Sequence, residues 1–198
     1  MQKIRPDMDI GKNIQSLRYK NNLTQDQVIA KLNLMGISMS KSTYAKLETK
    51  EQIDAFVERV NTLIPKLQAE GISLHYHNHD CDFAPTPEGL VPEEELLART
   101  NLLLEVDTYW VYAAGKDPVA FLQEHKDRIR VIHLKDGKGG DACASLGQGI
   151  APVAQVRQAA IQLGLEMVVE SEGLEPTGLE EVRRCMDFLR SEDQKDGN

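Results

Sequence analysis

The stretch ISLHYHNH, residues 72–79, alternates apolar and polar side chains over the length of a β-strand. Because successive side chains of a strand point to opposite sides, this alternation places His75, His77 and His79 on one face. Three imidazoles on one face are candidate metal ligands, but a solvated strand face or a satisfied core histidine would give the same pattern. The stretch alone leaves these alternatives open.

Three later apolar runs of strand length each carry an imidazole or a carboxylate at or near the C-terminal end. The runs are NLLLEVDTY (101–109), RIRVIHLKD (128–136) and LEMVVESE (165–172), and the side chains are Asp107, His133 and Glu170. Four strands therefore offer imidazole, carboxylate, imidazole and carboxylate, a mixture that Mn²⁺, Co²⁺, Zn²⁺ and Mg²⁺ accept. In a parallel α/β barrel such strand ends converge on the catalytic face.

Helical patterns separate these runs. They cover residues 51–71, 92–100, 119–126 and 152–163, and a last helix begins after Thr177 and ends near residue 190, before a frayed polar tail. Asp117 and Thr177 are the expected caps of two of these helices. The alternation of strand and helix predicts an α/β fold with about four parallel βα units, half of a TIM barrel, over residues 51–198.

Composition and charge separate a basic head from an acidic body. The 198 residues carry a formal net charge of −8, with 41% apolar and 27% charged residues. Residues 1–50 hold nine Lys or Arg against four Asp or Glu, whereas residues 51–198 hold fourteen against twenty-seven. A basic head suits a polyanion. We expect a cytoplasmic protein with three reduced cysteines and no membrane association, because the sequence shows no signal peptide, long apolar span or CxxC pair.

The head resembles the helix-turn-helix of phage-repressor-like DNA-binding proteins. The likeness rests on IGKNIQSLR, LTQDQVIAKL and SKSTYAKLE in that order. It implies a small all-α head, residues 1–50, whose DNA contacts would come from Gln25, Lys41, Ser42, Thr43 and Lys46. The pattern departs from the family in stopping near Thr49, before the two helices that close such a domain. A helical cap without DNA function is the alternative.

The body resembles the xylose-isomerase-like barrel superfamily of sugar and sugar phosphate isomerases and epimerases. The matching pieces are YHNHDCDF, LEVDTYWVYAAGKDP, RIRVIHLKDG, LGQG and VVESEG. The resemblance implies a divalent metal ion bound by Asp107, His133 and Glu170. The family commonly has a glutamate as fourth ligand on the strand that here reads HYHNH, so His77 is the first expected replacement and His79 the second.

The same resemblance implies proton transfer at a carbon beside the carbonyl of a small sugar or sugar phosphate, through an enediolate. Glu170 would be the base, with Lys135 and Glu172 as polar helpers. A surface ion pair between Lys135 and Asp136 is the alternative for the lysine.

Substrate contacts are expected at three further positions. Asp82 stands where related sequences carry an acidic residue, although its carboxylate is short. Gly147 and Gly149 could bring backbone amides to a phosphate, but a flexible loop would explain a lone GxG as well.

Four strands leave two sheet edges without neighbours, whereas a closed barrel of this type has eight strands. We therefore expect a homodimer that completes the ring. Two other functions remain open at this point: a DNA-binding regulator whose half-barrel senses a sugar or dimerises, and a recombined fragment without activity.

Overall fold

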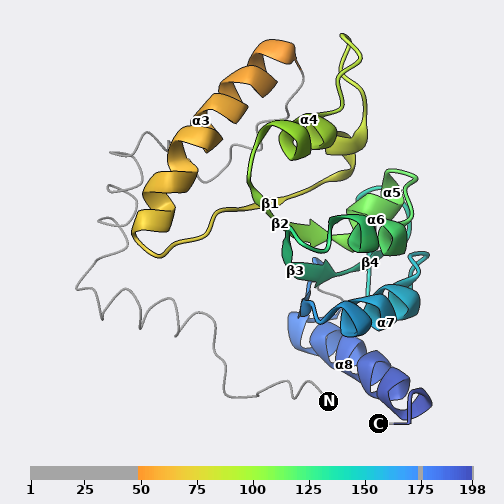
Figure 1. Ribbon diagram of the computed structural model, residues 1–198. Coiled ribbons are helices and arrows are strands. Elements are labelled where there is room, and N and C mark those ends of the chain that lie inside the picture. Colours follow the sequence, from red (N-terminus) through yellow and green to blue (C-terminus); the bar gives the residue numbers. More distant parts are fainter. Residues whose placement is uncertain (1–48, 174–175, 198) are drawn as a thin grey trace. The chain divides into compact units, whose positions relative to one another are not determined.

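The computed structural model describes residues 49–173 and 176–197. In that part of the chain a long helix precedes four parallel strands, and helices follow each strand (Figure 1). The helices are α3 (Lys50–Ala69), η1 (Asp80–Phe83), α4 (Pro92–Arg99), α5 (Thr108–Ala113), α6 (Pro118–His125), α7 (Val153–Leu163) and α8 (Gly178–Lys195). The strands are β1 (His75–His77), β2 (Leu103–Asp107), β3 (Ile129–Leu134), β4 (Asp136–Gly137), β5 (Cys143–Ala144) and β6 (Glu166–Val169).

The main sheet has the order β1, β2, β3, β6, and every neighbouring pair is parallel. Its register pairs His77 with Glu105 and Asp107 with His133, which brings polar residues of adjacent strands side by side. The N–H of Glu170, one residue past β6, donates to the carbonyl of Leu134. The predicted α/β fold is confirmed, and its four parallel strands correspond to half of a TIM barrel.

Side chains that cap helix ends explain where three helices begin. The Thr49 hydroxyl accepts from the N–H of Gln52, and the Gln52 side chain accepts from the N–H of Thr49. Asp117 accepts hydrogen bonds from two N–H groups in the first turn of α6, and Thr177 accepts from the N–H of Glu180. Asp117 and Thr177 are the caps that the sequence predicts.

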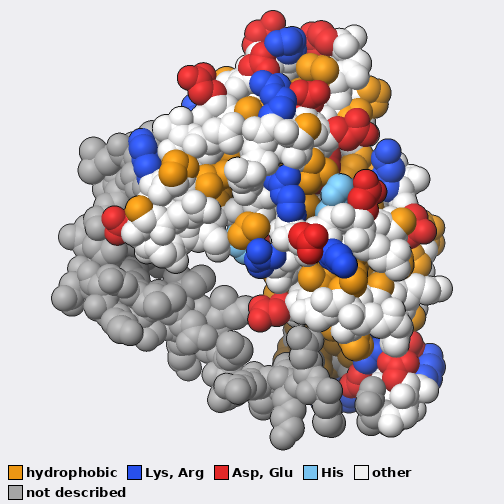
Figure 2. Space-filling view, viewed as in Figure 1, with side chains coloured by type: hydrophobic (Ala, Val, Ile, Leu, Met, Phe, Trp, Pro, Cys, Tyr) orange, Lys and Arg blue, Asp and Glu red, His pale blue; other side chains and the backbone are white. Residues whose placement is uncertain are grey.

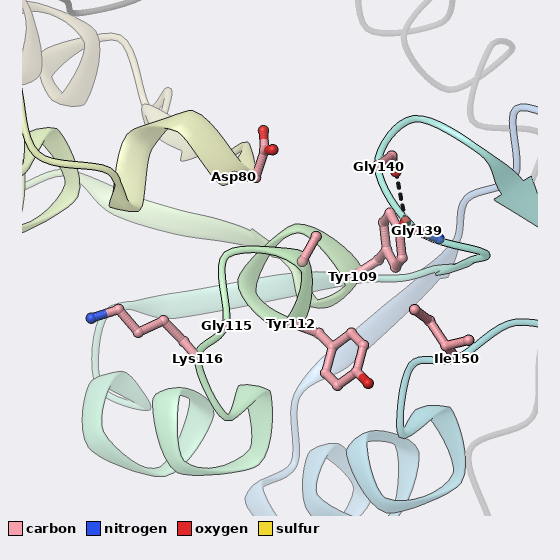
Figure 3. A pocket seen from close by; sticks show the side chains of 9 residues that line it. Asp80, Tyr109, Tyr112, Gly115, Lys116, Gly139, Gly140 and Ile150 are labelled. Atoms are coloured by element: carbon pink, nitrogen blue, oxygen red, sulfur yellow. Dashed lines mark hydrogen bonds between the residues drawn. The ribbon is translucent and has the colours of Figure 1, made fainter.

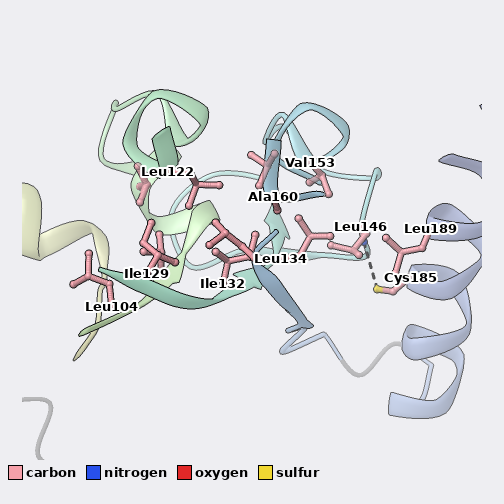
Figure 4. Packing of buried hydrophobic residues seen from close by; sticks show 14 of the residues in the cluster. Leu104, Leu122, Ile129, Ile132, Leu134, Leu146, Val153, Ala160, Cys185 and Leu189 are labelled. Atoms are coloured by element: carbon pink, nitrogen blue, oxygen red, sulfur yellow. Dashed lines mark hydrogen bonds between the residues drawn. The ribbon is translucent and has the colours of Figure 1, made fainter. Parts of the chain in front are cut away.

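The packed face of the sheet is apolar. Alternate residues of β2 and β3 point to this face, and each is at most 3% exposed: Leu104, Val106, Ile132 and Leu134. Figure 4 shows Leu104, Ile132 and Leu134 with side chains of α6, α7 and α8: Leu122, Ala160 and Leu189. Since side chains alternate along a strand, the residues between them belong to the opposite face. That face carries the polar residues.

On the visible face of the described part, acidic and basic side chains are interspersed (Figure 2). A few large apolar side chains are exposed as well, among them Leu179 and Val182 at the start of α8. In residues 49–173 and 176–197, no helix combines the length and the apolar character that crossing a bilayer requires.

The predicted strands are longer than the observed ones. The stretch 72–79 is a strand only over β1, because the chain turns into η1 directly after His79. The second predicted strand includes Tyr109, but β2 ends at Asp107, whose carboxylate caps the unpredicted helix α5. A polar residue at a strand end here starts the next helix.

The predicted frayed tail is wrong. The sequence predicts a helix that ends near residue 190, whereas α8 continues to Lys195. Arg157 of α7, which is 5% exposed, forms ion pairs with Asp193 and Asp196. These ion pairs hold the end of α8 against α7. Such contacts between distant segments cannot be predicted from the local sequence of a polar segment.

Two predictions are not tested by this part of the chain. The DNA-contact residues Gln25, Lys41, Ser42, Thr43 and Lys46 lie outside the described residues. No described strand pairs with the outer edges of β1 and β6, and the homodimer stays a prediction.

Candidate metal centre

Four side chains from the polar face converge at the C-terminal end of the sheet. His77, Asp107, His133 and Glu170 each offer one ligand atom, and these atoms all lie within 4.8 Å of one another. One residue comes from each of three strands and the fourth directly follows β6. The structure therefore brings together the metal ligands predicted from the sequence, with His77 as the fourth. We call these four residues the cluster.

Asp107 is fully buried and uses only one of its carboxylate oxygens in hydrogen bonds. Its Oδ1 accepts from the N–H groups of Tyr109 and Trp110 at the start of α5. Its Oδ2 has no hydrogen-bond partner among the described residues and lies 3.6 Å from Nζ of Lys135. Burial raises the pKa of Asp107 to about 6, although the nearby ammonium opposes the rise.

The backbone of Asp107 is fixed by the side-chain amide of Asn78, the residue that directly follows β1. The side chain of Asn78 donates to the carbonyl of Asp107 at 3.1 Å and accepts from its N–H at 3.0 Å. Asn78 is 2% exposed. These two bonds join the end of β1 to the end of β2, so that His77 and Asp107 keep their relative positions.

His133 lies between two carboxylates. Its Nε2 is 2.9 Å from Oε1 of Glu105, and its Nδ1 lies against Oε2 of Glu170 as an ion pair without hydrogen-bond geometry. Burial lowers the pKa of His133, but the contacts with Glu170 and Glu105 outweigh it and raise the pKa above its usual value. A metal ion at Nδ1 would therefore replace a proton.

Glu170 contacts two cations of the polar face. Besides His133, it accepts a hydrogen bond from Nζ of Lys135 at 3.0 Å. The contact with His133, opposed by burial and reinforced by Lys135, lowers the pKa of Glu170 to about 2. Glu170 is therefore an anion near pH 7, as a metal ligand must be, but a carboxylate with so low a pKa is a weak base.

Lys135 connects the cluster to Glu172. The lysine is 2% exposed, and its Nζ donates to Glu172 at 3.2 Å and lies 4.9 Å from the ring centre of Trp110. The alternative of a surface ion pair with Asp136 is wrong, since Asp136 is also buried and its carboxylate binds backbone amides.

The three histidines of the opening stretch have different surroundings. Burial, together with the neighbouring His133 and His79, lowers the pKa of His77 to about 4, so His77 is neutral near pH 7 and keeps a lone pair for a metal. The His79 ring packs against His77 and Trp110, with ring centres 5.0 Å and 5.5 Å away, and is not part of the cluster. His75 contacts the Ser73 hydroxyl.

The cluster fits a divalent ion. Two imidazoles and two carboxylates suit borderline and hard ions such as Zn²⁺, Co²⁺ and Mn²⁺. Oδ2 of Asp107 is a buried atom without a hydrogen bond in the described part of the chain. Such atoms are rare in folded proteins, and coordination to an ion would satisfy it.

The expected phosphate contacts at Gly147 and Gly149 are not supported. Both N–H groups donate to Oδ2 of Asp136, at 3.0 Å and 2.9 Å. The other oxygen of Asp136 accepts from the N–H groups of Gly137 and Ala151. Asp136 thus folds the loop after β3 around its own carboxylate, and these amides are not available to a ligand.

Asp82 also has a structural partner. Its carboxylate is 6% exposed, accepts from the N–H of His79 at 2.8 Å and contacts the Tyr76 hydroxyl. The side chain therefore holds η1 against β1, and the expected substrate contact is not supported.

A separate pocket of about 370 Å³ lies beside α5 (Figure 3). Its lining comes from the segments that follow β1, β2 and β3, with Tyr112, Lys116 and Ile150 among the side chains. No cluster residue lines it. The Tyr109 hydroxyl at its wall donates to the carbonyl of Gly140 at 2.6 Å.

Three candidate functional residues were not predicted from the sequence: Glu105, Asn78 and Trp110. Glu105 precedes Asp107 by two residues in an apolar run, so a carboxylate on the same strand face was a readable signal. Asn78 gave no signal, because its role depends on a strand 29 positions later. The buried Nε1 of Trp110 has no hydrogen-bond partner among the described residues.

Comparisons with known proteins agree with this fold. A sequence model of the family described as xylose isomerase-like TIM barrel matches residues 14–192. A solved sugar phosphate isomerase/epimerase from Parabacteroides distasonis is 27% identical, with a TM-score of 0.61, and the match covers 72% of this chain and 54% of that one. A D-tagatose 3-epimerase-like protein shares the fold at 14% identity, with a TM-score of 0.58 over 93% of this chain and 84% of that one.

A curated relative, inosose dehydratase from Geobacillus thermodenitrificans, is 30% identical over 88 residues, which are 44% of this chain and 30% of the relative. The chain thus spans about half the length of the Parabacteroides structure and less than a third of the dehydratase.

Proposed function

Because the chain belongs to the xylose isomerase-like TIM barrel family, we propose that it carries a divalent-metal-dependent site that isomerises or epimerises a small sugar or sugar phosphate. The observation that carries the proposal is the convergence of His77, Asp107, His133 and Glu170 within 4.8 Å. The sugar phosphate isomerase/epimerase among the similar structures supports the substrate class.

The four cluster residues would hold the ion. When bound, a divalent ion supplies positive charge that stabilises the negative charge developing on the sugar oxygens during proton transfer. The chain's own residues would bind the sugar and move the proton from the carbon beside its carbonyl.

Glu172 is the better candidate for the proton-moving carboxylate. Glu170 is held by His133 and Lys135, as described above, whereas the Glu172 side chain is 55% exposed and contacts Lys135 alone among the cations of the site. Glu172 lies two residues further along the chain, past the end of β6, and contacts the same Lys135 ammonium as Glu170. The Lys135 ammonium between the two carboxylates would orient Glu172 and attract the developing oxyanion.

The test separates metal binding from proton transfer. Purified protein loaded with Co²⁺ or Mn²⁺ is incubated with a panel of ketoses and ketose phosphates in D₂O, and NMR follows deuterium incorporation beside the carbonyl. Glu172→Gln should still bind the metal but lose exchange by at least about 100-fold, in line with general base catalysis. Glu170→Gln should lose both.

Glu166→Gln, an exposed residue of β6, is the matched control and should leave both measurements unchanged. The proposal would be contradicted by a wild-type chain that binds metal but exchanges no substrate proton with any sugar of the panel. Full exchange in Glu172→Gln would instead remove Glu172 from its assigned role.

A further inference from the structure

We propose that Glu105 is a positioning residue for the metal centre: it holds His133 so that Nδ1 faces the cluster. The proposal rests on the proposed function, because it assumes that His133 is a metal ligand. It assigns a role to a carboxylate that is outside the cluster.

The sheet places Glu105 beside His133. Glu105 and Asp107 are alternate residues of β2, so they share the polar face, and the register sets Asp107 directly opposite His133 on β3. From one position back on the same face, Oε1 of Glu105 reaches Nε2 of His133 at 2.9 Å. Both side chains are only partly exposed, at 34% and 17%.

The contact decides which nitrogen can bind a metal. Each ring nitrogen of His133 faces a carboxylate, which only accepts hydrogen bonds. With an ion in place of the proton at Nδ1, the remaining ring proton lies on Nε2, where Glu105 accepts it. Nδ1 then presents its lone pair to the cluster, where it lies against Glu170. The His77 ring packs against the His133 ring, with ring centres 4.8 Å apart, and further restricts the orientation of His133.

The carboxylate also strengthens the ligand. An imidazole that donates its second N–H to a carboxylate is a more basic metal ligand, and loss of such a partner typically weakens metal binding 10- to 100-fold. Glu105 has this arrangement, because it contacts Nε2 of His133, whereas Nδ1 faces Glu170 of the cluster. Glu105 would thus act on the ion through His133.

The experiment measures Co²⁺ affinity and the Co²⁺ absorption spectrum in four proteins: wild type, Glu105→Gln, Glu105→Ala and Glu172→Gln. Glu105→Ala should bind Co²⁺ about 10- to 100-fold more weakly. Glu105→Gln, which keeps an acceptor oxygen but not the charge, should fall between it and wild type. Both variants should shift the visible Co²⁺ bands, because the geometry at His133 changes.

Glu172→Gln removes one carboxylate charge near the cluster without touching a ligand imidazole, and its Co²⁺ spectrum should equal that of wild type. If Glu172→Gln weakens binding and shifts the bands as much as Glu105→Gln does, the effect is general electrostatics and the inference is overturned. It is also overturned if Glu105→Gln and Glu105→Ala match wild type. A wild-type chain without Co²⁺ binding would overturn the proposed function itself. Metal-free melting curves show whether each variant folds.

Discussion

The two faces of the same four-stranded sheet are built from alternate residues of the same strands, yet they follow opposite rules. On the packed face, Leu104, Val106, Ile132 and Leu134 are buried against helices. On the other, the cluster gathers two carboxylates and two imidazoles and leaves buried polar atoms without hydrogen bonds. Adjacent residues of one strand can therefore contribute separately to stability and to the candidate site, because their side chains point to opposite faces of the sheet.

Asp107 and Asp136 repeat the contrast on a smaller scale. Both carboxylates are at most 1% exposed and lie at strand ends. Asp136 accepts four backbone hydrogen bonds and shapes a loop, whereas Asp107 caps α5 with one oxygen and keeps the other for the cluster. The two buried carboxylates differ in how many hydrogen bonds they accept, and this difference separates the candidate ligand Asp107 from the structural residue Asp136.

The largest expected difference between the faces is in metal affinity. His133→Ala should lower Co²⁺ affinity by more than about 100-fold, because it removes a ligand and not only a partner of one. The adjacent Ile132→Ala should leave the affinity unchanged. Isothermal titration with Co²⁺ measures both, and equal losses in the two variants would erase the contrast.

Stability should show the reverse order. Ile132 is fully buried in the apolar core, so Ile132→Ala should lower the free energy of unfolding by about 2 to 5 kcal/mol. His133→Ala should lower it by less, since the two ion pairs that it removes involve a partly exposed ring. Urea unfolding of the metal-free proteins measures both changes. A larger decrease in unfolding free energy for His133→Ala than for Ile132→Ala would mean that the polar face contributes more to stability than the apolar core does.

A smaller, pH-dependent effect is expected at Glu93 of α4, a buried acid whose Oε2 has no hydrogen bond among the described residues. Burial raises the pKa of Glu93 from 4.5 to about 8, with Asp82 contributing. The folded chain then binds more protons than the unfolded one between these values, so stability should fall as pH rises through this window. One such group gives at most about 1.4 kcal/mol per pH unit.

Glu93→Gln mimics the protonated acid. We expect it to match wild type near pH 4.5 and to exceed it in unfolding free energy near pH 8, as measured by urea unfolding across the range. A stability difference that does not change with pH would contradict the burial argument.

The sequence predicts the fold and most of the candidate site because both depend on alternation. Apolar runs that end in Asp107, His133 and Glu170 locate three strands and one face. The identity of the fourth histidine or carboxylate was ambiguous between His77 and His79. The turn into η1, which directly follows His79, directs the two rings differently and is not evident from the sequence. Contacts between distant segments were not readable: Asn78 with Asp107, Arg157 with the end of α8, and Asp136 with the loop amides.

The central claim is that His77, Asp107, His133 and Glu170 bind one common ion. Crystals grown with Co²⁺ and measured at the cobalt absorption edge test it most directly. The account predicts a single anomalous peak within about 2.0 to 2.3 Å of one atom of each of the four side chains, the range of metal–nitrogen and metal–oxygen bonds in proteins. The absence of a peak there, or a peak held by other side chains, would contradict it.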